Sequence, residues 1–271
     1  MKKLTFLLSL FTLMMFEMGL GVVAQPNDRW KAGSALLLTD TIETLYCFAE
    51  TEANPWFESE KANMIASLES AQRWLAQQAG QWNVPLLFKN SPLQSGETIR
   101  FDSILSGTGS GKEQVDWIKK VVQHADYRNS RQACRNLSRK FHNKNILVVV
   151  FAHADGISYA MRYAKGMSKK KYFMEGILIY QRYDNGAEMP VSCIVSHEIL
   201  HLYGAWDLYR TYAQTLEKQS KARELYPDDI MLRVDYAMET LKIDRLTAWL
   251  LGWNPTEEEI FEWFRPEDYR K

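Results

Sequence analysis

The expected fold is decided by one stretch of the chain, Ser196-His197-Glu198-Ile199-Leu200-His201-Leu202-Tyr203-Gly204-Ala205-Trp206-Asp207. If the chain is helical as far as Tyr203, His197 and His201 lie one turn apart on one face, where two imidazoles can bind the same metal ion. Gly204 can adopt the left-handed backbone that ends a helix, and the bend then directs Asp207 back toward both histidines. The stretch therefore predicts a helix that carries a metal site.

Glu198 makes a catalytic role possible for this site. Zinc with three protein ligands keeps its fourth position for water and lowers the pKa of that water to about 7. A carboxylate beside the water can take its proton and later pass it to a leaving amine. Glu198 follows His197 directly and is the candidate for that role.

The pattern H-E-x-x-H-x-x-G-x-x-D over residues 197–207 resembles the zinc signature of the metzincin metallopeptidases, in the snapalysin-like variant with aspartate in place of the third histidine. Those enzymes also have a methionine-containing turn beneath the metal. The segment Pro227-Asp228-Asp229-Ile230-Met231 resembles that turn and follows Asp207 by 24 residues. The resemblance covers roughly residues 191–253.

The resemblance implies a secreted zinc-dependent endopeptidase, in which metal-activated water hydrolyses peptide bonds and Glu198 is the general base. Zn²⁺ would be bound by His197, His201 and Asp207, with Met231 as an apolar floor below them. Its substrates would be peptides or proteins.

The implied fold is α/β (α+β), a metzincin-like zincin domain over residues 25–271. Its upper part, about 25–204, would hold a twisted mixed sheet with helices above the cleft. The lower part, 205–271, would be smaller and helical.

A strand expected at residues 172–180 has an implied role in substrate binding. In metzincins the strand before the zinc helix region lies at the sheet edge above the metal, and the substrate adds to it as an antiparallel strand. Such edge pairing gives affinity that tolerates many sequences. The resemblance makes four residues candidates for this contact: Gly176, Ile177, Leu178 and Ile179.

The chain departs from the family at one position. Many metzincins have a tyrosine two residues after the methionine, and here that position is Arg233. Sites of this kind need a donor beyond the metal for the developing oxyanion. Tyr203, Tyr209 and Tyr236 remain the alternatives for that donor.

Three other interpretations of the motif compete with this one. A thermolysin-like enzyme would take its third ligand from a second helix, where Glu217 or Glu224 is available. A non-catalytic binding protein could keep the metal for stability alone, although a structural site has no use for the intact Glu198. The histidines and Glu198 could also form only a hydrogen-bonded cluster.

The start of the chain predicts export. Lys2 and Lys3 precede an apolar segment that ends in Val22-Val23-Ala24, which predicts a signal peptide over residues 1–24 with cleavage near Ala24/Gln25. The product would be secreted or periplasmic, without stable membrane insertion. Its net charge would be −1, because two lysines and one glutamate leave a chain of net charge 0. A near-neutral protein has no electrostatic basis for binding nucleic acid.

The three cysteines do not form a complete set of pairs. Export permits one disulfide, most simply Cys47 with Cys134, but the sequence does not fix the choice. Cys193 lies one helical turn before His197, where a buried, inert thiol is expected because the metal already has three ligands.

Hydrophobic patterning predicts alternating strands and helices upstream of the motif. The continuous run Ile-Leu-Val-Val-Val-Phe within residues 145–151 predicts a strand buried on both faces and central in a sheet. Further strands are expected at 35–49, 85–88 and 98–105. Helices are expected at 57–78, 115–124, 131–141, 191–203, 216–224, 243–253 and 256–264.

Overall fold

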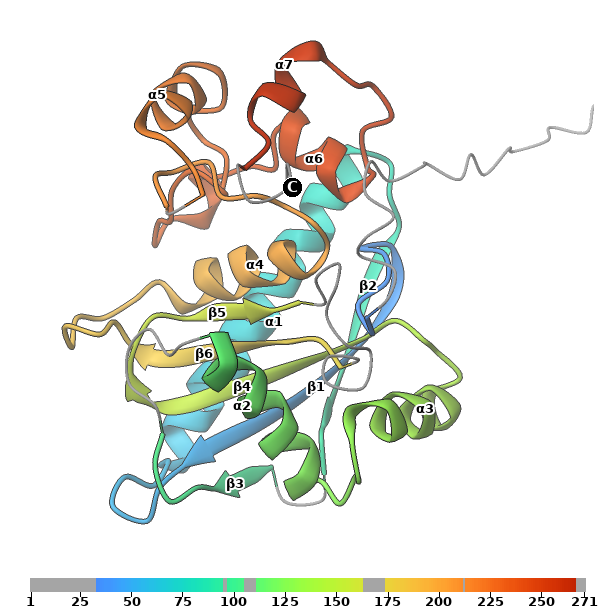
Figure 1. Ribbon diagram of the computed structural model, residues 1–271, viewed down its shortest axis with the longest axis vertical. Helices are drawn as coiled ribbons and strands as arrows, with labels where there is room; N and C mark the ends of the chain where they lie inside the picture. Colours follow the sequence, from blue (N-terminus) through green and yellow to red (C-terminus); the bar gives the residue numbers. More distant parts are fainter. Residues whose placement is uncertain (1–32, 95–96, 105–110, 163–173, 212, 267–271) are drawn as a thin grey trace, which may run out of the picture.

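The computed structural model describes residues 33–94, 97–104, 111–162, 174–211 and 213–266, with the backbone alone given over 111–116. A six-stranded mixed sheet with helices on both sides forms the larger part of the molecule (Figure 1). The predicted α/β class is confirmed. The signal peptide expected over residues 1–24 lies outside the described residues.

The sheet has the strand order β2-β1-β4-β6-β5, and β3 also pairs with β1. All neighbouring pairs are parallel except β5 with β6. The strands are β1 (Asp40–Glu50), β2 (Leu86–Pro92), β3 (Thr98–Arg100), β4 (Ile146–Asp155), β5 (Tyr159–Met161) and β6 (Gly176–Arg182).

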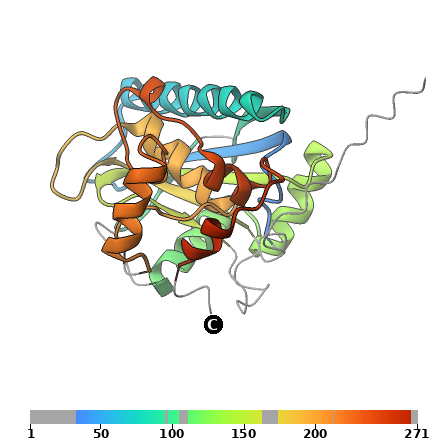
Figure 2. The same ribbon diagram turned by 90° about the horizontal axis from the view of Figure 1, so that it is seen from above.

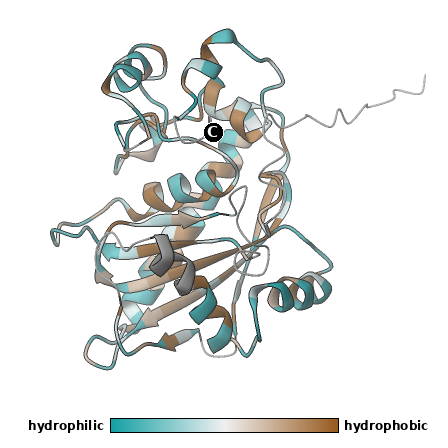
Figure 3. Ribbon diagram, viewed as in Figure 1, coloured by the Kyte–Doolittle hydropathy of each residue, from teal (hydrophilic) through white to brown (hydrophobic). Residues whose placement is uncertain are grey.

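Strand β4 is central, as its sequence predicts. It pairs with β1 on one side and β6 on the other, and its residues 146–152 are fully buried. A strand without a polar face must be covered on both sides. Figure 3 accordingly shows hydrophobic residues concentrated along the central strands, whereas α5 on the periphery is largely hydrophilic.

Helices cover both faces of the sheet. Figure 2 shows α1 (Glu58–Gln81) and α4 (Val191–Leu202) on one side, and α2 (Gly111–His124) and α3 (Ser130–Phe141) on the other. Helix α4 packs against α1 and against strands β5 and β6. The helix that carries the histidine motif is therefore held between a long helix and the sheet.

The chain after Asp207 is helical where it has regular structure. Its elements are α5 (Leu216–Leu225), η2 (Met238–Thr240), α6 (Arg245–Leu251) and α7 (Glu259–Trp263). Side chains near the end of α1 connect to this part: Trp74 Nε1 donates to the Met238 carbonyl at 3.0 Å, and the Ile243 amide donates to Gln78 Oε1 at 2.9 Å. These bonds fix the C-terminal helices relative to the sheet domain.

Two local expectations are wrong. The strand expected at 85–88 is longer, because β2 continues to Pro92. Cys47, in β1, and Cys134, in α3, do not form a disulfide, and both are buried. Burial raises the pKa of Cys47 to about 12, so this thiol stays protonated and unreactive.

Within the described part of the chain, no helix has both the length and the apolar character that a bilayer span requires.

Candidate metal centre

Helix α4 presents both histidines of the motif on one face. Its residues are almost all buried, and His197 and His201 follow one another after one turn. Their rings meet edge to face, with centroids 4.7 Å apart, and the two Nε2 atoms are separated by 3.1 Å. The expected pairing of the imidazoles is present.

A bend after α4 returns the third side chain of the motif. Gly204 has φ +108°, a conformation that favours glycine because a Cβ would clash there. The bend places Asp207 Oδ1 3.1 Å from His201 Nε2 and 3.2 Å from His197 Nε2. One atom from each of three residues thus forms a nearly equilateral triangle.

Backbone contacts hold this bend in place. The Leu208 amide donates to the Met231 carbonyl at 2.8 Å, and Gln214 Nε2 donates to the Asp207 carbonyl at 2.9 Å. Gln214 is buried and also donates to the Phe264 carbonyl at 3.0 Å. The position of the Asp207 carboxylate therefore depends on the turn at Met231 and on the end of the chain's last helix.

The hydrogen bond made by Nδ1 of each imidazole determines whether Nε2 is available to bind a metal ion. His197 Nδ1 lies 3.0 Å from the Ile230 carbonyl, and His201 Nδ1 lies 3.0 Å from the Ala205 carbonyl. A carbonyl only accepts, so both Nδ1 atoms carry a proton, and in the neutral rings the Nε2 lone pairs are free. Such contacts typically orient metal-binding histidines.

The triangle consists of three electron-pair donors that face one another. Neutral Nε2 atoms and a carboxylate oxygen at 3.1–3.2 Å repel unless a cation lies among them. Ligand atoms about 2.1 Å from a tetrahedral zinc ion lie about 3.4 Å apart, close to these separations. His197, His201 and Asp207 therefore fit a metal ion, and they are the group of this kind found among the described residues.

Charges within the site shift its ionisation equilibria. Burial opposes the charged form of His197, but its hydrogen bond to Asp207 and the negative charges of Glu198 and Asp207 outweigh burial and raise its pKa to about 9. Burial also opposes ionisation of Asp207, yet the two histidines hold its pKa well below the usual range. A proton thus replaces the cation when no metal is bound.

Glu198 lies beside the triangle with 7% of its surface exposed. Burial raises its pKa, while the positive charges of His201 and His197 oppose the shift. The backbone amide of Ala160 in β5 also favours the ionised form. A carboxylate with a raised pKa beside a metal site suits the reversible transfer of a proton.

A cavity of about 310 Å³ opens next to Glu198, His197 and Tyr209. Ser158, Tyr183 and Arg233 contribute to its wall. The remaining lining residues are apolar: Ile157, Met189, Ile194, Leu232 and Val234. The cavity can therefore accept an apolar group immediately beside the candidate metal site.

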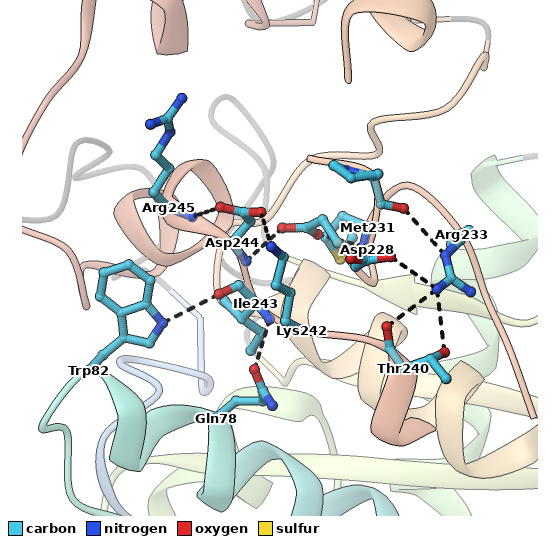
Figure 4. Close-up of polar contacts among 12 residues, drawn as sticks. Gln78, Trp82, Asp228, Met231, Arg233, Thr240, Lys242, Ile243, Asp244 and Arg245 are labelled. Carbon is cyan, nitrogen blue, oxygen red and sulfur yellow. Dashed lines mark hydrogen bonds and ion pairs between the residues drawn. The ribbon is translucent and has the colours of Figure 1, made fainter. Parts of the chain in front are cut away.

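The turn that contains Met231 contacts the site through its backbone, because the Ile230 carbonyl binds His197 Nδ1. Met231 is fully buried, and its amide donates to Asp229 Oδ1 at 2.8 Å. Asp229 Oδ2 accepts from the Asp244 amide at 2.9 Å, which joins the turn to the start of α6 (Figure 4). Burial raises the pKa of Asp229 to about 6. The Ile230 carbonyl that binds His197 is thus fixed by its neighbours on both sides.

Arg233 closes the same turn from outside. Its guanidinium pairs with Asp235 at 2.7 Å and with Asp228 at 3.3 Å, and donates to the Pro227 carbonyl at 3.3 Å. It also donates to the carbonyl and hydroxyl oxygens of Thr240, both at 3.3 Å (Figure 4). Arg233 therefore stabilises the turn.

The thermolysin-like alternative is wrong for this chain. Glu217 and Glu224 lie on α5 with exposed side chains, and Glu224 pairs with Lys221 at 2.8 Å. The described group of potential ligands contains Asp207 and neither glutamate. The bend at Gly204 explains the outcome, because it brings a carboxylate to the histidines from the same segment of chain.

The expected place of the substrate-binding strand at the edge of the sheet is wrong. Gly176, Ile177, Leu178 and Ile179 lie on β6, which is fully buried there and pairs with β4 and β5. The edge strand is β5, Tyr159–Met161, which runs antiparallel to β6 and packs near α4. A strand of three residues is too short to give a periodic signal in the sequence.

The three tyrosines considered as oxyanion donors differ in exposure and in their contacts with the site. Tyr203 is 1% exposed and donates to Asn145 Oδ1 at 3.2 Å, while Tyr236 is 68% exposed and donates to the Glu188 carbonyl at 3.0 Å. The Tyr209 ring lies 6.0 Å from the His197 ring and borders the cavity. Spacing alone gives no signal for this choice, nor for the carbonyls of Ile230 and Ala205.

No protein-family model and no curated protein matches this sequence. Among solved structures, the chain is similar to metalloproteinase-II from Bacteroides fragilis, with 10% sequence identity and a TM-score of 0.40. The similarity covers 81% of this chain and 54% of that structure, so this chain spans about half the length of its structural neighbour.

Proposed function

We propose that this chain is an exported zinc-dependent endopeptidase of the metzincin type. One observation carries the proposal: three electron-pair donors, from His197, His201 and Asp207, converge at 3.1–3.2 Å beside a buried carboxylate and an open cavity. A proton on His197 could hold the same three atoms together, but a hydrogen-bonded cluster gives no role to Glu198 or to the cavity beside it. A purely structural metal site has no need of Glu198 at the cavity wall.

Zinc is the metal that we assign to the site. Two imidazole nitrogens and one carboxylate oxygen are a ligand set typical of catalytic zinc, which leaves a fourth position open. When bound, the ion would supply Lewis acidity, by which it polarises a carbonyl and lowers the pKa of a nearby water to about 7. Met231 would lie in the turn beneath, as the apolar floor that the resemblance implies.

Glu198 would move the proton during peptide hydrolysis. It takes a proton from a water molecule in the cavity while the water oxygen bonds to the scissile carbonyl carbon. The same carboxyl group then gives the proton to the amide nitrogen as the carbon–nitrogen bond breaks. One water is consumed, and a carboxylate and an amine are released. The raised pKa of Glu198 strengthens it as the base in the first of these steps.

The substrate would lie along β5 rather than β6. Edge strands bind extended peptides through backbone hydrogen bonds, and β5 is the edge nearest α4. Side chains of Ile194 and Leu232 line the cavity at the site, so an apolar substrate side chain beside the scissile bond would be preferred. Exposed Ile157 continues the apolar surface at the cavity wall.

Export and domain organisation complete the proposal. Residues 1–24 would be a signal peptide, and the mature protein from Gln25 would be secreted or periplasmic. The catalytic domain would span residues 25–271, with the sheet domain up to about residue 204 and the helical part from 205 onward.

Glu198→Gln tests the assignment. The variant keeps the size of the side chain but cannot accept a proton, so we expect one zinc ion per chain and cleavage of a peptide library slowed by at least about 100-fold. Glu217→Gln, on the exposed face of α5, is the matched control and should match the wild type. Unchanged cleavage by a zinc-loaded Glu198→Gln protein would show that the role of Glu198 is wrong.

A further inference from the structure

We propose that Tyr209 is a catalytic residue whose hydroxyl donates a hydrogen bond to the oxygen of the attacked peptide carbonyl as negative charge develops on it. The inference rests on the proposed peptidase function. It assigns to Tyr209, two residues after Asp207, a task that the family resemblance would place two residues after Met231.

The position of Tyr209 follows from the bend that places Asp207. The amide of the intervening Leu208 donates to the Met231 carbonyl at 2.8 Å, so the chain on both sides of Leu208 is fixed against the turn. The Tyr209 ring packs 6.0 Å from the His197 ring, at an angle of 31°. Its side chain is half-buried and packs against the hydrophobic core. The ring is thereby held beside the candidate metal site.

The Tyr209 hydroxyl hydrogen-bonds to the Asp207 carboxylate and therefore lies at the candidate metal site. Tyr209, Glu198 and His197 border the same cavity, which is the space that a substrate carbonyl must enter. A phenol with its ordinary pKa of about 10 keeps its proton at neutral pH, as a hydrogen-bond donor must.

No other described side chain at the cavity is equally suited to this task. Arg233, which occupies the family's tyrosine position, pairs with Asp235 and directs its guanidinium to Asp228 and Thr240 as well. Figure 4 shows the contacts with Asp228 and Thr240. Ser158 Oγ accepts from the Tyr180 amide at 3.1 Å, on the side of the sheet. Tyr183, the other phenol in the cavity wall, has no contact with the Asp207 or Glu198 carboxylates among its described interactions.

Tyr209→Phe separates catalysis from structure. The phenyl ring preserves the packing against His197 and removes only the donor. Loss of one such donor typically lowers kcat by about 100-fold or more. We expect this loss with KM and the zinc dissociation constant changed by no more than about threefold. Tyr236→Phe removes an exposed hydroxyl that binds the Glu188 carbonyl and should leave all three values unchanged.

A phosphinic peptide gives a readout that does not depend on turnover. Its tetrahedral phosphorus mimics the attacked carbon, and its oxygens occupy the position of the developing oxyanion. We expect the zinc-loaded Tyr209→Phe protein to bind this peptide at least about tenfold more weakly than the wild type does. Equal binding would overturn the inference.

The alternative role for Tyr209 is to position Asp207. In that case Tyr209→Phe would weaken zinc binding by about 10- to 100-fold, and saturating zinc would restore kcat. That result would overturn the catalytic role while leaving the peptidase proposal intact. A zinc-loaded wild type that neither cleaves the peptide library nor binds the phosphinic peptide would instead contradict both.

Discussion

The Nε2 atoms of His197 and His201 lie 3.1 Å apart, and both rings bind backbone carbonyls through Nδ1. Two neutral nitrogens that turn their lone pairs toward each other repel at this distance. The Asp207 oxygen, 3.1–3.2 Å from both, adds a negative charge to the same space. This arrangement requires a cation, and it leads to the following predictions.

The metal-free protein should become less stable as the pH rises from about 6.5 to about 9. The pKa of His197 is raised to about 9 in the fold, compared with 6.5 for an unperturbed histidine. A raised pKa contributes stability that is complete below the unfolded value and is lost as the pH passes through the folded one. Urea unfolding of chelator-treated protein at several pH values measures the effect.

The same shift predicts that zinc binding at pH 7 releases about one proton, because the metal needs neutral His197. Calorimetry in buffers of different ionisation enthalpy measures this number. A zinc-free stability that rises between pH 6.5 and 9, or zinc binding without proton release, would contradict the assigned charge state of the site.

Asp207→Ala should weaken zinc binding by at least about 100-fold, since it removes a ligand and leaves two imidazoles alone. Chelator competition measures the dissociation constant. Glu217→Ala and Glu224→Ala are controls, because both side chains are exposed on α5 and should leave zinc affinity unchanged. Loss of zinc from either control, with Asp207→Ala unaffected, would restore the thermolysin-like assignment.

Gly204→Ala should reduce both stability and zinc affinity. The φ of +108° is strained for alanine, which costs at least about 1 kcal/mol, and relief of the strain displaces Asp207. Thermal unfolding and chelator competition report the two effects. Gly80→Ala is a matched control, because an added Cβ there meets no atom within 4 Å and α1 is helical at that point. We expect that control to be neutral or slightly stabilising.

Leu232→Ala should change which peptides are cleaved. The side chain lines the cavity beside Glu198, and its truncation makes room for a larger apolar group. A change of this size in a hydrophobic pocket alters relative kcat/KM by about tenfold or more. Profiling with a peptide library should show a shift toward bulkier apolar side chains. Leu216→Ala, 59% exposed on α5, should leave the profile unchanged, and identical profiles for Leu232→Ala would refute the role of the cavity.

The central strand and the motif helix could be predicted from the sequence because their signals are local. The β-branched run in β4 has no polar face, so it must be covered on both sides. The spacing of His197 and His201 fixes their common face once α4 is helical, and Gly204 marks the bend. Each of these features depends on a few adjacent residues.

Other features depend on contacts between distant segments and could not be predicted. Strand β5 has only three residues, so no pattern marks it, and its place at the edge is set by its antiparallel pairing with β6. The choice of Tyr209 over Tyr203 and Tyr236 depends on how the loop after Asp207 binds the Met231 carbonyl. Whether Cys47 and Cys134 pair likewise depends on how β1 and α3 pack, which no local pattern specifies.

X-ray absorption at the zinc edge, on the purified mature chain loaded with one equivalent of zinc, tests the metal site most directly. The structure predicts two imidazole nitrogens at about 2.0–2.1 Å and a carboxylate oxygen at about 2.0–2.2 Å, with the oxygen lost in Asp207→Ala. A sulfur ligand at about 2.3 Å, which would come from Cys193, or a protein that retains no zinc, would contradict the site as assigned.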